Sequence, residues 1–163
     1  MGSTLTVDNI VGATTAANVK MPAGATLQVV SAALSTGVSF DTTTGTSLNM
    51  MTLNITPKYA TSKILVIANI GMYMNSSSNE VRGEFFIKRD STLIRGREGS
   101  SGSGYFRDSS GHFKSMMSGF NHLDSPATTS QINYKLGWRG MTHAVGGQFV
   151  EDYTSLSLME ISV

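Results

Sequence analysis

The side chains that could carry out acid–base or metal chemistry are few in this sequence and widely spaced. None of the three histidines has a second histidine or a carboxylate at the close spacing typical of zinc or iron sites. His122 lies two residues before Asp124, but no nucleophile accompanies the pair. Residues 108–112 contain an aspartate, two serines and His112, yet neighbours within one loop rarely converge on one reacting atom. We therefore predict no catalytic residue and no bound metal.

Phosphate binding and glycoside cleavage are also poorly supported. The glycines of residues 99–104 are not followed by Lys-Ser or Lys-Thr, so this stretch is not a phosphate-binding loop. Glycoside cleavage needs two carboxylates at a matched distance, and no spacing in the sequence selects such a pair. The candidates by presence alone are Glu80, Glu84, Glu98, Glu151 and Asp152. We predict that the protein is not an enzyme and binds no cofactor, and we keep a carbohydrate-active enzyme as the alternative from the catalytic class.

Composition narrows the possible partners. The 163 residues fit one compact domain with a short extension. A net charge of +1 and a charged fraction of 14% leave no electrostatic signal for nucleic acid or an anionic membrane. The chain has no cysteine, no apolar run near the roughly 20 residues of a membrane helix, and no recognisable export signal at its start. We predict no nucleic-acid partner and no membrane insertion.

Residues 63–74 form the stretch around which the fold is expected to be organised. The even positions from Ile64 to Met74 are all apolar, whereas the odd positions mix apolar residues with Asn69, Gly71 and Tyr73. A helix is the competing interpretation, but the β-branched residues and the polar flanks favour a strand. We expect a central strand whose two faces are both largely covered.

The rest of the chain after residue 25 shows strand patterns separated by turns. A change of phase between Met50 and Met51 predicts a β-bulge, and a second phase slip is expected at Leu158 and Met159. Residues 89–92 predict a tight hairpin turn, and residues 95–104 and 141–152 predict long loops. The remaining strands are expected at 27–33, 37–41, 47–55, 81–89, 113–123, 132–139 and 154–163. This pattern predicts an all-β fold, an antiparallel β-sandwich of jelly-roll type.

The first 24 residues differ in composition from the rest. Small residues dominate, so this segment alone cannot bury enough surface to offset about 1–2 kcal/mol of backbone entropy per residue. Pro22 and Gly24 mark a boundary. We predict an extended arm over residues 1–24 and a head domain over residues 25–163. The candidate attachment residues of the arm are Leu5, Val7, Ile10, Val11, Val19 and Met21.

Several stretches together resemble virion proteins of tailed bacteriophages. They are STLTVDNI at 3–10, ANVKMPAGATLQVV at 17–30, ITPKYATSKILV at 55–66, FFIKRDSTLIRG at 85–96, LDSPATTS at 123–130 and LMEI at 158–161. Short fibre-like structural proteins of marine and cyanobacterial phages are the most similar of these. The resemblance spans residues 3–161, although none of its motifs carries chemistry.

The resemblance implies a β-sandwich protomer that assembles as a homotrimer on the surface of a virion. Its partners would be other virion proteins, bound through the arm, and a host cell-surface glycan is a candidate ligand. This chain lacks the extended shaft and tail-attachment domain of long tail fibres. A short tail fibre or spike that takes part in host attachment is favoured, with the tail favoured over the head. A capsid or tail decoration protein is the alternative.

Aromatic residues next to the predicted loops are the best candidates for contacts with a receptor or partner, because rings stack on sugar faces and contribute strongly to binding. Trp138 is expected in the core, since it alternates with Tyr134 and Leu136. For Tyr105 and Phe106, a contact within the trimer and a contact with a receptor are equally supported. The candidate contact residues are Tyr105, Phe106, Arg107, His112, His143 and Phe149.

Overall fold

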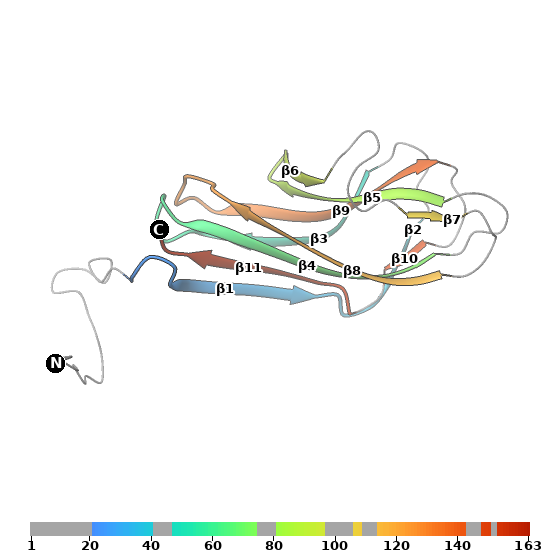
Figure 1. Cartoon of the computed structure of the whole chain (residues 1–163), viewed down its shortest axis with the longest axis horizontal. Helices are drawn as coiled ribbons and strands as arrows, with labels where there is room; N and C mark the ends of the chain where they lie inside the picture. Colours follow the sequence, from blue (N-terminus) through green and yellow to red (C-terminus); the bar gives the residue numbers. More distant parts are fainter. Residues whose placement is uncertain are drawn as a thin grey trace.

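The protein is a sandwich of two antiparallel β-sheets (Figure 1). A computed structural model describes residues 21–40, 47–74, 81–96, 106–108, 114–142, 148–150 and 153–163. Every strand pairing within these ranges is antiparallel, and the ranges contain strands and no helix. The described part of the chain therefore has no helix long and apolar enough to cross a membrane.

The two sheets have six and five strands. In the six-stranded sheet the order is β1-β11-β4-β10-β2, with β8 also pairing with β4, and in the five-stranded sheet it is β3-β9-β5-β6, with β7 also pairing with β5. The first sheet contains β1 (Thr26–Ala33), β2 (Val38–Phe40), β4 (Lys63–Met74), β8 (Lys114–Asp124), β10 (Gln148–Val150) and β11 (Ser155–Ile161). The second contains β3 (Ser47–Ile55), β5 (Val81–Arg89), β6 (Thr92–Gly96), β7 (Phe106–Asp108) and β9 (Ile132–Thr142).

Strand β4 is central, as the sequence predicts, and its observed bounds are the predicted ones. It pairs with β8 along its whole length, and on its other side with β11 and then β10. The even positions from Ile64 to Met72 are fully buried between the sheets. The expectation that both faces are covered is wrong, because Leu65 and Ile67 are only half-buried and Asn69 is exposed.

The core lies between the two sheets and consists of inward-facing apolar side chains. Trp138 is fully buried, as predicted, and its ring lies 4.7 Å from that of Phe85 at an interplanar angle of 59°. Tilted aromatic pairs of this kind add about 0.5–1.5 kcal/mol beyond the burial of their surface. The pair joins β5 to β9 at the centre of the five-stranded sheet.

Two local predictions are confirmed. The register between β3 and β9 shifts between Asn49 and Met51, which places Met50 and Met51 together in the core. The hairpin from β5 to β6 turns at Asp90, whose φ of 53° is the left-handed conformation that tight turns need.

The phase slip expected at Leu158 and Met159 is wrong. Strand β11 keeps its register with both neighbours through Leu158 and Met159, and it alternates regularly between buried and half-buried residues; its one register shift with β1 lies between Thr26 and Gln28. Glu160 therefore points inward beside the core. Its hydrogen bonds, described below, explain how this burial is possible.

The outward side of strand β5 is covered rather than solvated. Glu84 and Phe86 both lie on that side and are fully buried. Phe86 lies over Gly137 of β9, where a Cβ atom would come within 2.2 Å of the ring. The glycine makes room for a ring that covers the outside of the sheet.

The long loops predicted at 95–104 and 141–152 are shorter than expected at their described ends. Strand β6 extends to Gly96, β9 extends to Thr142, and β10 occupies part of the second predicted loop. Strand β7, which follows the first loop, was not predicted at all. Three-residue strands such as β7 and β10 are too short for an alternating pattern to identify them.

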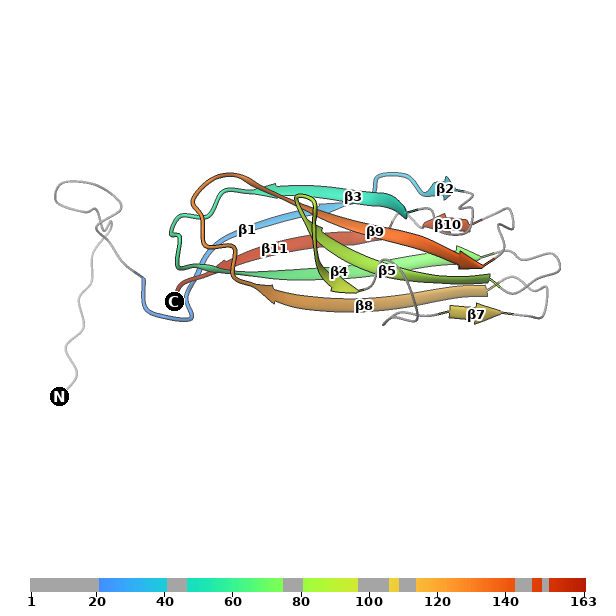
Figure 2. The same ribbon diagram turned by 90° about the horizontal axis from the view of Figure 1, so that it is seen from above.

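The sandwich has two different ends (Figures 1 and 2). The segment that leads into β1 and the C-terminus lie together at one end, which we call the proximal end. The short strands β2, β7 and β10 lie at the opposite, distal end.

Candidate functional site at the ends and outer face of the sandwich

Three of the predicted contact residues lie on the short distal strands. Phe106 and Arg107 of β7 pair with Gly83 and Arg82 of β5. Phe149 of β10 lies between β2 and β4, in the other sheet. The backbone therefore brings two of the three predicted loop aromatics to the same end of the molecule on different sheets.

The other predicted contact residues cannot be placed in the same way. Tyr105, His112 and His143 lie outside the described residues. The same holds for the predicted attachment residues of the arm other than Met21, namely Leu5, Val7, Ile10, Val11 and Val19. Their roles stay predictions.

The proximal end fixes the root of the predicted arm against the C-terminus. The backbone N–H of Gly24 donates to the carbonyl of Ser162 at 2.8 Å, and the N–H of Ser162 donates to the carbonyl of Ala25 at 2.9 Å. Gly24 has a φ of 84°, a conformation that a side chain disfavours. These bonds hold the segment before β1 against the end of β11.

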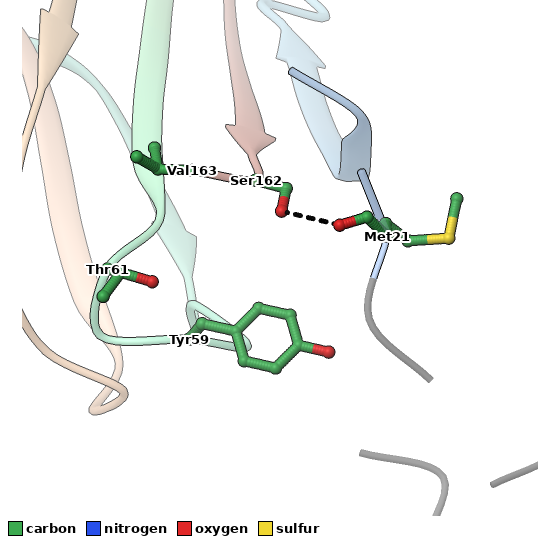
Figure 3. Close-up of a pocket in the computed structure, with 5 residues that line it drawn as sticks. All are labelled: Met21, Tyr59, Thr61, Ser162 and Val163. Atoms are coloured by element: carbon green, nitrogen blue, oxygen red, sulfur yellow. Dashed lines mark hydrogen bonds between the residues drawn. The ribbon is translucent and has the colours of Figure 1, made fainter. Parts of the chain in front are cut away.

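A small pocket of about 120 Å³ opens at this root (Figure 3). The Ser162 hydroxyl donates to the carbonyl of Met21 at 3.3 Å across it. The Tyr59 ring and Thr61 form the opposite wall, and Val163 completes the lining. A mixed apolar and polar pocket of this size accepts one side chain rather than a cofactor.

The buried Glu160 carboxylate ties three segments together next to this pocket. It accepts a hydrogen bond from the backbone N–H of Lys58 at 2.7 Å and one from that of Tyr59 at 3.4 Å. The Gln28 amide on β1 donates to the other carboxylate oxygen and to the carbonyl of Thr56. Buried charge is tolerated where such bonds satisfy it. The glutamate thereby holds the connection between β3 and β4 against β11 and β1.

A second buried carboxylate, that of Asp124, joins the two sheets. It accepts hydrogen bonds from the Tyr134 hydroxyl at 2.7 Å and from Arg89 Nη1 at 3.0 Å to each oxygen. The backbone N–H of Ser125 donates to it at 2.9 Å. Burial, and then the hydrogen bond to Asp124, raise the pKa of Tyr134 well above its ordinary value, so the phenol remains a donor. The cluster is a structural bridge.

A shallow pocket of about 160 Å³ lies on the outer face of the six-stranded sheet, next to Tyr153. The Tyr153 ring covers Gly71, where a Cβ atom would come within 1.8 Å of the ring. The hydroxyl of Thr154 accepts from the Gly71 N–H at 3.0 Å and donates to the Gly71 carbonyl at 3.1 Å. Thr154 thus supplies hydrogen bonds to the backbone of β4 at the point where the neighbouring strand changes from β11 to β10. The other lining residues are Asn69, Ile70, Met117, Ser118 and Gly119.

No catalytic arrangement is seen among these groups. The residues that the structure describes contain no cluster of three or more His, Cys, Asp or Glu side chains able to hold a metal ion. Asp124 is engaged by Arg89 and Tyr134, whereas no hydrogen bond joins it to His122 two positions earlier. The sequence pattern marks neither Glu160 nor Tyr153 as a site residue, and Asp124 stands out in it only for its spacing from His122.

Comparison with known proteins identifies the fold. No family model matches the sequence, and no curated protein matches it. A chain of the T13 particle of infectious bursal disease virus is similar in structure, with a TM-score of 0.53 and 14% identity over 81% of this chain and 30% of that chain. Chains of the Gx strain of that virus and of its VP2 subviral particle give TM-scores of 0.49 and 0.48, with 17% and 15% identity over 81% of this chain and 32% of each of theirs.

This chain spans about a third of the length of those viral chains. At these identities the similarity concerns the fold alone. It confirms the predicted β-sandwich of jelly-roll type.

Proposed function

We propose that this protein is a structural component of a virion and has no enzymatic activity. The observation that carries the proposal is the jelly-roll fold, which a chain of a viral particle shares over 81% of the present chain. Two features agree with it: the buried carboxylates of Glu160 and Asp124 are engaged in structural hydrogen bonds, and the two pockets described above are small and shallow. These are properties of a scaffold that is held by partners.

Within that role we propose a short trimeric tail fibre or spike of a tailed bacteriophage that takes part in host attachment. The polarity of the sandwich supports this assignment, because the root of the arm and the proposed receptor-facing strands lie at opposite ends (Figure 1). The proximal end also contains the Glu160 bonds and the pairing of Gly24 with Ser162, which would resist force on the arm. The distal end would present Phe106 and Phe149 to a host glycan.

A capsid or tail decoration protein is the second candidate. It is favoured by the fact that the structurally similar chain comes from the particle of an icosahedral virus. In that role the arm would attach the protein to the capsid, and the distal end would need no specific ligand.

Localisation on intact particles separates these roles. Antibody labelling of purified phage should place the protein at the head for a capsid decoration protein and at the tail for a fibre or a tail decoration protein, and the adsorption assay separates the last two. Purified full-length protein should block adsorption to host cells if it binds a receptor, and lack of any effect would count against attachment. A hydrolysis screen on host polysaccharide should yield no product, and a released oligosaccharide would overturn the non-enzymatic assignment.

The role of the arm is tested by deleting residues 2–20 and leaving the segment from Met21 intact, because that segment pairs with Ser162. The shortened protein should fold and fail to join the particle. Normal incorporation would show that attachment uses another surface.

A further inference from the structure

The outer face of the six-stranded sheet has an unbroken apolar row across four adjacent strands. Pairing places Val29 of β1 opposite Met159 of β11, Met159 opposite Leu65 of β4, and Leu65 opposite Leu123 of β8. Val29 is 54% exposed and Leu123 is 48% exposed, so the row is open at both ends. Monomeric soluble proteins rarely leave such a continuous apolar surface without a partner.

The rest of this face is made of small or uncharged residues. The next rows toward the distal end contain Ser31, Ser157, Ile67 and Asn121, and then Ala33, Ser155, Asn69 and Gly119. Met117, which is 80% exposed, and the half-exposed Tyr153 border its distal part. Between the row that contains Val29 and the position of Gly71, none of the described residues on this face is charged. The nearest charge toward the proximal end is Lys63, two residues before Leu65 on β4.

The outer face of the five-stranded sheet provides a contrast within the same molecule. There, Lys88 of β5 pairs with Lys135 of β9, and Arg139 of β9 pairs with Glu84 of β5. Depletion of charged residues, together with enrichment in residues such as Met, distinguishes the core of an interface from ordinary surface. The two outer faces of the sandwich therefore differ in charge, although Glu84 on the charged face is itself buried.

We propose that this face, the Val29–Leu123 face, is where copies of the chain associate with one another. A second copy is the occupant that the area and charge favour. With strands about 4.8 Å apart and residues about 3.3 Å apart, the paired parts of β1, β11, β4 and β8 have a flat area of about 550 Å². Two copies together contribute about 1,100 Å², which reaches the size of about 1,000 Å² expected of a specific interface.

Self-association also suits the chemistry of the face. When two identical surfaces pack together, a charged residue on one copy lies close to the same residue on the other copy and the two repel. A face without charged residues avoids this repulsion. The small side chains of Ser31, Ser157 and Gly119 allow close approach beside the apolar row, and the pocket at Tyr153 offers a hollow for a side chain of the other copy. The inference rests on the self-association in the proposed function; because a face that meets its own copy joins chains in pairs, it assigns one contact between copies and not the whole trimer.

The test is the solution mass of the full-length protein by light scattering over a range of concentrations, with two matched variants. Val29→Glu places a charge on the Val29–Leu123 face at an exposed position of a strand. Thr52→Glu makes the same change at an exposed position of β3, whose partner in β9 is Lys135, and serves as the control. Circular dichroism of both variants checks that the sandwich is intact.

We expect the wild type and Thr52→Glu to be oligomeric. Val29→Glu should raise the apparent dissociation constant by about 100-fold or more, because a charge would be buried at the contact without a partner. Leu123→Glu, at the other end of the row, should reproduce the effect. Two folded variants that both give monomers, beside an oligomeric control, would support the proposal.

Two results would overturn it. An oligomer unaffected by Val29→Glu and Leu123→Glu would place the contact elsewhere, and a wild type that is monomeric at all concentrations would show that this face does not join copies. If that monomer still joined the particle and the Val29→Glu variant did not, the face would belong to another virion protein. Particle incorporation is scored separately, so loss of this inference would leave the virion role standing.

Discussion

Replacement of Asp124 by alanine tests how the two sheets are held together. The Asp124 carboxylate belongs to β8 of the six-stranded sheet. It accepts hydrogen bonds from Tyr134 of β9 and Arg89 of β5, which belong to the five-stranded sheet. Its removal leaves the hydroxyl of the fully buried Tyr134 without an acceptor. We expect Asp124→Ala to destabilise the fold through that orphaned donor more than through the lost ion pair.

The magnitude follows from the exposure of each partner. The Arg89 side chain is 27% exposed and can turn to water, so its share is discounted toward the about 0–1 kcal/mol of a surface pair. A buried hydroxyl that loses its partner costs about 1–3 kcal/mol, and the upper part of that range applies here because the lost acceptor is charged. Together these give about 3 kcal/mol. For a protein of this size the melting temperature should fall by about 6–12 °C.

The assay is urea unfolding at one fixed protein concentration, because self-association would otherwise shift the midpoint. Tyr134→Phe should cost about 1 kcal/mol in the wild-type background. In the Asp124→Ala background the same change should cost nothing or restore stability, since it removes the orphaned hydroxyl. If the two changes were additive, Tyr134 and Asp124 would not act as a unit and the bridge between the sheets would be misassigned.

Three further predictions concern other parts of the fold. Glu160→Ala should lower the free energy of unfolding by about 3 kcal/mol, because the carboxylate holds backbone N–H groups of the connection between β3 and β4; a loss under about 1 kcal/mol in urea unfolding would contradict this. Gly71→Ala should cost about 1–2 kcal/mol by displacing the Tyr153 ring, and adding Tyr153→Ala should remove most of that cost; an equal cost in both backgrounds would refute the contact. The raised pKa keeps the Tyr134 phenol protonated in the folded protein, whereas in the unfolded chain it ionises near its ordinary pKa of about 10. The contribution of Tyr134 to stability is therefore present below about pH 10 and should be lost as the pH rises above that value. Unfolding measured from pH 8 to 11 should show this loss in the wild type and not in Tyr134→Phe.

The elements that alternate over many residues could be predicted from the sequence. The bounds of β4 follow from twelve residues of alternation between polar flanks, and the bulge in β3 follows from two adjacent buried methionines. The fold class follows from these patterns and the turn signals, because the hydrophobic period and the turns act locally. Trp138 could be assigned to the core for the same reason.

What could not be predicted depends on partners far away in the chain. A charged residue such as Glu160 is expected at the surface, and this favoured a phase slip in the closing strand that the structure does not contain. Glu160 is buried because Lys58, Tyr59 and Gln28, which are distant in sequence, donate hydrogen bonds to it. The alternation in its strand places Phe86 on the outer side of the sheet, but its ring is buried there against Gly137 of β9. In both cases the deciding contact comes from another strand.

The Val29–Leu123 face could not be found from the sequence for a related reason. Each of its strands contributes only one or two apolar residues on the outer side, which is ordinary for a surface strand. The row forms because the registers of β1, β11, β4 and β8 place these apolar residues directly opposite one another. Strand order, which the sequence does not give, creates the surface.

The central claim is that the protein is part of a virion, and the most direct test is its detection on purified phage particles. Intact particles from a strain that encodes the protein would be purified, analysed by mass spectrometry and labelled with an antibody against the sandwich for electron microscopy. We predict that the protein copurifies with infectious particles and that label appears at a fixed position on the tail. Absence of both the peptides and the label from infectious particles would contradict the account.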